Sequence, residues 1–184
     1  MRLSYNTPAG DSLIDETYDG FRVVTGKTVV LTGSFTRPAD TTAYTANDQV
    51  ANSTSAPVAG TITSIVRGTG MGAVVLGATL LKSTNVTTNA SFRARLFSAA
   101  PVMANDNAAY SPALASLALC LGHIDFSVPI AGADCVRFVG TLYSDRIAIA
   151  NLAATTLWWN LQALGAYTPG SAEAFSLILS LVQD

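Results

Sequence analysis

The sequence predicts an all-β protein: an antiparallel β-sandwich, jelly-roll-like, with an extended N-terminal arm and at most one short helix. Three observations support this fold class. Short runs of β-branched and aromatic residues recur along the chain, turn residues such as Gly, Pro, Asn and Asp separate them, and only one stretch has the composition of a helix. A smaller sandwich or a barrel is the alternative architecture.

The chain length fits one domain preceded by an arm. Its 184 residues are enough for one substantial core. Residues 1–20 have no apolar periodicity and are interpreted as an extended N-terminal arm, and residues 21–184 are assigned to a single β-sandwich domain. The first residues contain no apolar run of the signal-peptide type, so we expect no secretion signal.

Ten segments have the composition of strands. In chain order they are residues 21–24, 28–31, 60–67, 73–82, 91–97, 120–126, 136–142, 146–152, 155–164 and 174–182. The first two are expected to form a loose hairpin around Gly26. Gly77 interrupts a longer apolar run and predicts a β-bulge. The helix is expected over 111–118, with Ser111 as its N-cap and Pro112 at its first position.

Alternation along two strands predicts which side chains form the core. Phe92, Ala94 and Leu96 share the expected core face of their strand, so Arg93 and Arg95 point to solvent or to a partner. In the last strand, residues 175, 177, 179 and 181 are apolar, whereas the other face mixes serines with Ile and Val. The last strand is therefore expected to be covered on one face and half-covered on the other.

Composition excludes two classes of partner. Only 12% of residues are charged, where a soluble domain has about 25%, and the formal net charge is −2. The ten basic residues form no dense cluster, so nucleic acid is not an expected partner. The apolar runs are well short of the roughly 20 residues that a membrane span needs. A nearly neutral surface of small side chains favours contact with other proteins.

The polar segment 35–57 lies between two predicted strands and is rich in turn residues. Pro38 sets a turn and forces Arg37 toward extended backbone, and the Asp40 side chain is suited to bonding nearby backbone groups. Loops of this length inside a compact domain are usually functional or interfacial. The segment therefore predicts a structured connection with a role at an interface.

Several blocks of sequence between residue 34 and the C-terminus carry a family resemblance. They are Phe35-Thr36-Arg37-Pro38-Ala39-Asp40-Thr41-Thr42-Ala43-Tyr44 with Asp48, Val50 and Ser53-Thr54-Ser55-Ala56-Pro57; Thr88-Asn89-Ala90-Ser91-Phe92-Arg93 with Leu96-Phe97-Ser98-Ala99-Ala100-Pro101; Asn105-Asp106-Asn107-Ala108-Ala109-Tyr110; Gly122-His123-Ile124-Asp125-Phe126; and Ala166-Tyr167-Thr168-Pro169-Gly170-Ser171-Ala172-Glu173. On these blocks the chain resembles the small virion structural proteins of tailed bacteriophages.

The resemblance implies a capsid cement (decoration) protein. Such a protein would bind the outside of the head shell as a homodimer or homotrimer and stabilise contacts between subunits of the major capsid protein. It would have no enzymatic activity and no cofactor, and it would contact neither nucleic acid nor membrane. The alternative is a receptor- or glycan-binding module of a tail fibre or spike.

Three sequence features suggest chemistry, and each has a simpler explanation. Gly10-Asp11-Ser12-Leu13 matches the signature of GDSL hydrolases, but no buried strand precedes it and the residue three before His123 is a cysteine, so it predicts a turn. His123 is the only histidine and lacks companion ligands, so it predicts no metal site. Asn105-Asp106-Asn107 is interpreted as a turn, and a cation site is the less favoured alternative.

Six residues are candidates for contact with a partner. Trp158 and Trp159 are adjacent in one strand, so one ring is expected in the core and the other at an interface, with stacking on a sugar as the alternative. The predicted interface set is Arg37, Tyr44, Arg93, Arg95, Trp158 and Trp159. Cys120 and Cys135 are expected to be free, buried thiols, and a disulfide between them is the alternative.

Overall fold

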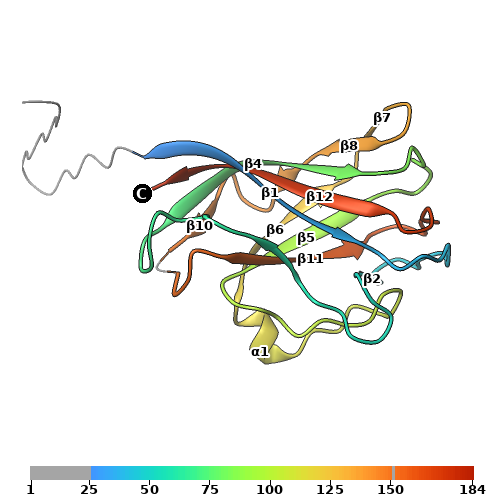
Figure 1. Ribbon diagram of the computed structural model, residues 1–184, viewed down its shortest axis with the longest axis horizontal. Helices are drawn as coiled ribbons and strands as arrows, with labels where there is room; N and C mark the ends of the chain where they lie inside the picture. The colour runs from blue at the N-terminus through green and yellow to red at the C-terminus, as the bar shows by residue number, and fades with distance from the viewer. Residues whose placement is uncertain (1–25, 151) are drawn as a thin grey trace, which may run out of the picture.

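Two antiparallel sheets pack face to face in the computed structural model of the protein (Figure 1). The structure describes residues 26–150 and 152–184, which form twelve strands and one four-residue helix. The prediction of an all-β sandwich with at most one short helix is therefore confirmed. The predicted arm at 1–20, the Gly10–Leu13 tetrapeptide and the strand expected at 21–24 lie outside the described residues.

The first sheet has the strand order β1-β12-β4-β8-β7, and β10 pairs with β4 beside this path. Its strands are β1 (Lys27–Thr36), β4 (Ala73–Lys82), β7 (Pro129–Ala131), β8 (Val136–Val139), β10 (Ile147–Ile149) and β12 (Ala174–Gln183). The longest ladders join β12 to both β1 and β4. The strand β12 is thus an interior strand, and β1 is the edge strand among the described residues.

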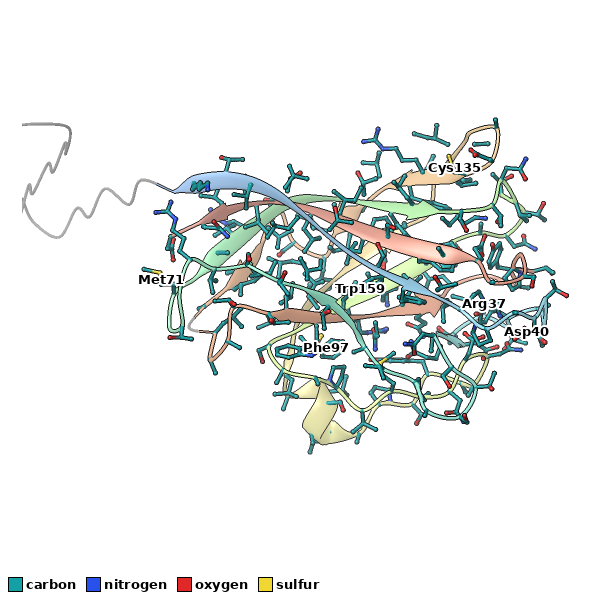
Figure 2. All side chains as sticks on the ribbon, viewed as in Figure 1. Arg37, Asp40, Met71, Phe97, Cys135 and Trp159 are labelled. Atoms are coloured by element: carbon teal, nitrogen blue, oxygen red, sulfur yellow. The ribbon has the colours of Figure 1, made fainter. Side chains whose placement is uncertain are left out.

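The second sheet has the order β2-β11-β5-β6-β9, and β3 also pairs with β11. Its strands are β2 (Gln49–Val50), β3 (Gly60–Ile62), β5 (Phe92–Phe97), β6 (Cys120–Phe126), β9 (Thr141–Leu142) and β11 (Leu157–Ala163). Trp159 of β11 lies between the two layers (Figure 2). Its ring packs directly on Gly60. There is no room for a side chain at this position, since a Cβ on Gly60 would lie 2.5 Å from the indole.

The core lies between the sheets and follows the predicted alternation. Phe92, Ala94 and Leu96 are all fully buried. In β12, residues 175, 177, 179 and 181 are fully buried and alternate with half-buried residues. The half-covered face expected for the last strand is therefore confirmed.

Several of the predicted strands differ in length from the observed ones. The strand expected over 28–31 is part of the longer β1, and the one expected over 146–152 is shortened to β10. The strand expected over 60–67 ends at Ile62, because Ser64 adopts a left-handed φ of 59° that no strand accommodates. The strand expected over 136–142 divides at Gly140 into β8 and β9, which belong to different sheets. The bulge predicted at Gly77 is confirmed by the shift in the β12–β4 register between Ser180 and Leu181.

The helix α1 (Leu114–Leu117) is shorter than predicted and starts later. Its N-cap is Ala113, which has extended backbone and supplies no side-chain hydrogen bond. The prediction that Ser111 caps the helix and Pro112 begins it is therefore wrong. Only one helical turn forms, because it has neither a capping side chain nor an acidic first turn to stabilise it.

The segment that contains α1 covers the outer side of the second sheet. Phe97 lies on the same side of the sheet as α1 in Figure 2 and is fully buried, although it is not part of the core between the sheets. Asn160 and Gln162 of β11 are also buried. The second sheet is thus sandwiched between the core and a layer of connecting chain.

Candidate interaction surface

The outer side of the first sheet carries exposed and half-buried side chains and almost no charge. Pairing register and alternation assign to it Thr28, Val30, Thr32 and Ser34 of β1, Ser176, Ile178, Ser180 and Val182 of β12, Val74, Leu76, Thr79 and Leu81 of β4, Arg137 and Val139 of β8, and Ile130 of β7. We call this set the open face. Arg137 is the single charged side chain in it.

Large apolar side chains of the open face are exposed to solvent. Val30 is 63% exposed, Leu76 54%, Ile130 55% and Val139 58%. These four come from four strands, so they are spread over the sheet and not gathered at one tip. Together with the hydroxyl groups interspersed among them, they give this side of the sheet a surface that another protein can cover.

An ionic cluster that is buried except for the partly exposed Asp40 lies at the end of the sandwich where β1 runs into the 37–48 connection (Figure 2). The Arg37 Nε donates to the Tyr44 hydroxyl at 2.8 Å, and its Nη2 lies 3.0 Å from Asp106 Oδ2 and 3.1 Å from Asp40 Oδ1. Tyr44 in turn donates to Asp106 Oδ1 at 2.7 Å. We call these four residues the Arg37 cluster.

A second buried cluster surrounds Lys82 at the end of β4. The Lys82 Nζ donates to Glu173 Oε1 at 2.8 Å, to the Tyr167 hydroxyl at 3.0 Å and to Thr84 Oγ1 at 2.8 Å. Tyr167 and Thr84 also donate to the Glu173 carboxylate. Both charged side chains are 0% exposed, so the pair is entirely removed from solvent. These four residues form the Lys82 cluster.

The two clusters are joined into one polar network. The rings of Tyr44 and Tyr167 stack with their centroids 6.3 Å apart, and the Arg37 backbone N–H donates to the Glu173 carbonyl at 3.0 Å. The network therefore ties together four connections, 37–48, 83–91, 98–113 and 164–173. The polar segment after β1 is held by these buried contacts.

The electrostatics of the network favour a structural role. Burial, followed by hydrogen bonding to a carboxylate, raises the pKa of both Tyr44 and Tyr167 above the usual range, so each hydroxyl remains a donor. Burial lowers the pKa of Lys82, and the hydrogen bond to Glu173 opposes this shift. Every charge has a partner, which is the condition for a buried ion pair to persist.

The six predicted interface residues fall into two groups. Arg37, Tyr44 and Trp159 are almost completely buried within this chain, at 2%, 1% and 0% exposure. Their side chains contact other parts of the same domain and are not presented to a partner. Arg93, Arg95 and Trp158 are half-buried on the second sheet, and their contact with a partner stays a prediction.

Arg93 and Arg95 both have partners on the outer side of the second sheet. Arg93 forms a two-pronged ion pair with Asp125 at 2.6 and 2.7 Å, and this pairing lowers the pKa of the Asp125 carboxyl. Arg95 donates to Gln162 at 2.7 Å and lies over the Tyr110 ring at 4.2 Å. These contacts join β5 to β6, to β11 and to the 98–113 connection.

His123, Cys120 and Cys135 show no arrangement that would bind a metal. The His123 ring packs against Tyr143 at 4.5 Å, and burial together with Arg93 lowers its pKa. Cys120 and Cys135 are free thiols, as expected, but they are half-buried and not buried. Within residues 26–150 and 152–184, no three His, Cys, Asp or Glu side chains are grouped to hold a metal ion. The described part of the chain also contains no helix long and apolar enough to cross a membrane.

Sequence reasoning missed most of the open face and the long-range partners of Arg37. The one signal for the open face was in strand 174–182, where the face opposite the core mixes serines with Ile and Val and is only partly polar. Asp106, the buried partner of Arg37, lies in an Asn-Asp-Asn run that resembles an ordinary turn.

Comparisons with protein-family models, with curated proteins and with solved structures give no match to this chain.

Proposed function

We propose that this protein is a bacteriophage capsid cement protein, a non-enzymatic component that binds the outside of the head shell and stabilises contacts between major capsid subunits. The open face carries the proposal. Its exposed Val30, Leu76, Ile130 and Val139 belong to a broad surface that another protein can bury with one charge, that of Arg137, to neutralise. Repetition of this contact over a symmetric shell would add many modest interactions into a stable layer.

The strand order supports a jelly-roll sandwich, the architecture implied by the family resemblance. The order β1-β12-β4-β8 in one sheet faces β3-β11-β5-β6 in the other. Apart from the β5–β6 pair, chain neighbours among these eight strands lie in opposite sheets. A jelly roll consists of eight strands wound through two sheets in this manner.

The buried network supports the proposal by making the body rigid. The Arg37 and Lys82 clusters fix four connections at one end of the sandwich, so the sheet that carries the open face is firmly supported. A preformed surface loses little conformational entropy on binding, which favours a clamp that must attach at many equivalent positions.

A receptor- or glycan-binding module is the alternative function. It needs an exposed aromatic ring with planar polar side chains beside it. Trp158 is half-buried, but Asn160 and Gln162, the nearby candidates in the sequence, are 2% and 4% exposed. The open face therefore has more support than Trp158 as the contact surface.

The test uses phage heads that lack this protein, to which the purified full-length chain is added back. A lysine at Val139 would place a charge inside the buried contact, so V139K is expected to weaken head binding about tenfold or more, which corresponds to roughly 1.4 kcal/mol. Binding of the natural chain is expected to change little between low and high salt, since few charges take part. Co-sedimentation and electron microscopy measure the occupancy.

V102K is the matched control. Val102 is 77% exposed and lies beside α1, on the opposite side of the molecule from the open face. Equal weakening by V102K and V139K would contradict docking through the open face. Antibody labelling of a few copies at the tail, with none over the head, would favour the receptor-binding alternative.

A further inference from the structure

The strand β1 lies at an edge of the first sheet and is paired on one side only. Its ten residues Lys27–Thr36 form an uninterrupted antiparallel ladder with β12, and no described strand pairs with its other side. Backbone N–H and C=O groups on an unpaired edge are available to another strand.

The even-numbered residues of β1 direct their backbone toward the open edge. One residue beyond β1, the Arg37 N–H donates to the Glu173 carbonyl at 3.0 Å, which identifies that pair as hydrogen-bonded. Hydrogen-bonded and non-bonded pairs alternate in an antiparallel ladder, so the odd-numbered residues bond to β12. Thr28, Val30 and Thr32 therefore present their N–H and C=O groups to the outside, and no backbone hydrogen bond within the described residues reaches them there.

The edge of β1 also lacks the features that usually protect an edge strand. Between Thr28 and Thr36 it contains no proline, no charged residue and no bulge. The opposite edge of the same sheet, β7, has only three residues and begins with Pro129. The terminal strands of the second sheet, β2 and β9, have two residues each. β1 is therefore the exception among the edges.

The first half of β1 is the part of this edge that lies away from the other sheet's β3, which crosses the core face of β1. At Gly33 the strand β3 passes close by, since an ideal Cβ on Gly33 would lie 2.2 Å from the Thr61 carbonyl oxygen. Residues 28–32 lie before this crossing. They alternate Thr, Val and Thr on the outward face, which suits pairing with another strand of the same kind.

We propose that β1 pairs antiparallel with β1 of a second copy of this chain, across a two-fold axis near Val30, so that two first sheets join into one continuous sheet. A two-fold contact places the same patch on both partners, and this patch carries no charge that would be repelled by its own copy. Pairing about Val30 sets Lys27 opposite Gly33, so the two lysines do not meet. The contact is independent of the head shell.

The test measures the mass of the full-length chain in solution by light scattering and sedimentation over a range of concentrations. The natural chain is expected at twice 19.1 kDa. The substitution Val30→Pro removes an N–H that points outward and leaves the bonds to β12 intact, so it is expected to give a folded chain of 19.1 kDa. Val30→Lys is a second variant that keeps the N–H and places two like charges near the axis. V139K changes the open face away from this edge and is expected to remain a dimer.

Amide hydrogen exchange identifies the pairing strand. In the dimer the N–H groups of Thr28, Val30 and Thr32 are expected to be protected, and in monomeric V30K they are expected to exchange at least about tenfold faster. A natural chain that is monomeric at every concentration, or a dimer that survives both V30P and V30K, would overturn the proposal. Protection of these amides in a monomer would also overturn it and would assign the edge to residues 1–25. Neither result depends on whether the chain binds phage heads.

Discussion

Lys82 shows how strongly a single buried charge depends on its partner. The ammonium and the Glu173 carboxylate are both 0% exposed and 2.8 Å apart. Removing one member of such a pair leaves the other charged in an apolar environment, which costs about 3–5 kcal/mol. We therefore expect K82M to lower the free energy of unfolding by about this amount, measured by denaturant titration.

The same measurement on two further variants separates the charge effect from the loss of a side chain. K82M combined with E173Q removes both charges while keeping an acceptor for the Tyr167 hydroxyl, so it is expected to be more stable than K82M alone. K27M changes an exposed lysine and is expected to stay within about 0.5 kcal/mol of the natural chain. A K82M variant as stable as K27M would contradict the structural role of the Lys82 cluster.

His123 gives the protein a pH dependence that can be assigned to one residue. It is the single histidine, and burial together with Arg93 lowers its pKa below the ordinary 6.5. A lowered pKa means that the unfolded chain binds the proton more readily, so stability is highest above the ordinary value and is lost as the pH falls toward the folded-state pKa. Urea midpoints between about pH 8 and pH 5 should show this decrease.

The substitution His123→Gln tests that assignment. It removes the titrating group, so the urea midpoint is expected to become flat over the same pH range until the carboxylates begin to titrate. Asp125, whose pKa is lowered by Arg93, contributes its own loss only at more acidic pH. A slope that is unchanged in H123Q would show that another group is responsible.

Among the elements, β1 and β3 depend on a glycine at their crossing. A Cβ on Gly33 would lie 2.2 Å from the Thr61 carbonyl oxygen and 2.6 Å from Ile62 Cγ1, so backbone would have to move. Overpacking of this kind costs about 1–3 kcal/mol. G33A is therefore expected to lower the free energy of unfolding by about that amount, measured by thermal and denaturant unfolding.

Gly77 provides the control at a second strand glycine. It lies at the bulge of β4, and an added Cβ would meet nothing within 4 Å. G77A is expected to change stability by no more than about 0.5 kcal/mol. If G33A and G77A were equally stable, the close approach of β3 to β1 would not be a constraint on the fold.

At the level of the whole molecule, the sequence predicted the parts that depend on local pattern. Alternation identified the buried faces of β5 and β12, and Gly77 marked the bulge, because side-chain burial in a strand follows a period of two. The boundaries at Ile62 and Gly140 were not predictable, since they depend on where the chain must leave a sheet in three dimensions.

The roles of individual residues were harder to predict, because partners lie far apart in the chain. Arg37 and Tyr44 were candidates for an interface, but both are buried and donate hydrogen bonds to Asp106, which lies 69 residues beyond Arg37. The open face is spread over β1, β4, β7, β8 and β12, and only the strand order brings these pieces together. The pairing of Arg37 with Asp106 has no local sequence signal, and the open face has only one, the weak polarity of the second face of 174–182.

The division of one predicted strand at Gly140 has a mechanical consequence. A single residue separates β8, which pairs with β4, from β9, which pairs with β6, and a Cβ there would come within 2.6 Å of Ile124 and 2.8 Å of Phe126. At this corner the chain passes directly from one sheet to the other, with only one residue between the two strands. Unfolding of either sheet would therefore strain the other, and we expect the two sheets to unfold together in one cooperative transition.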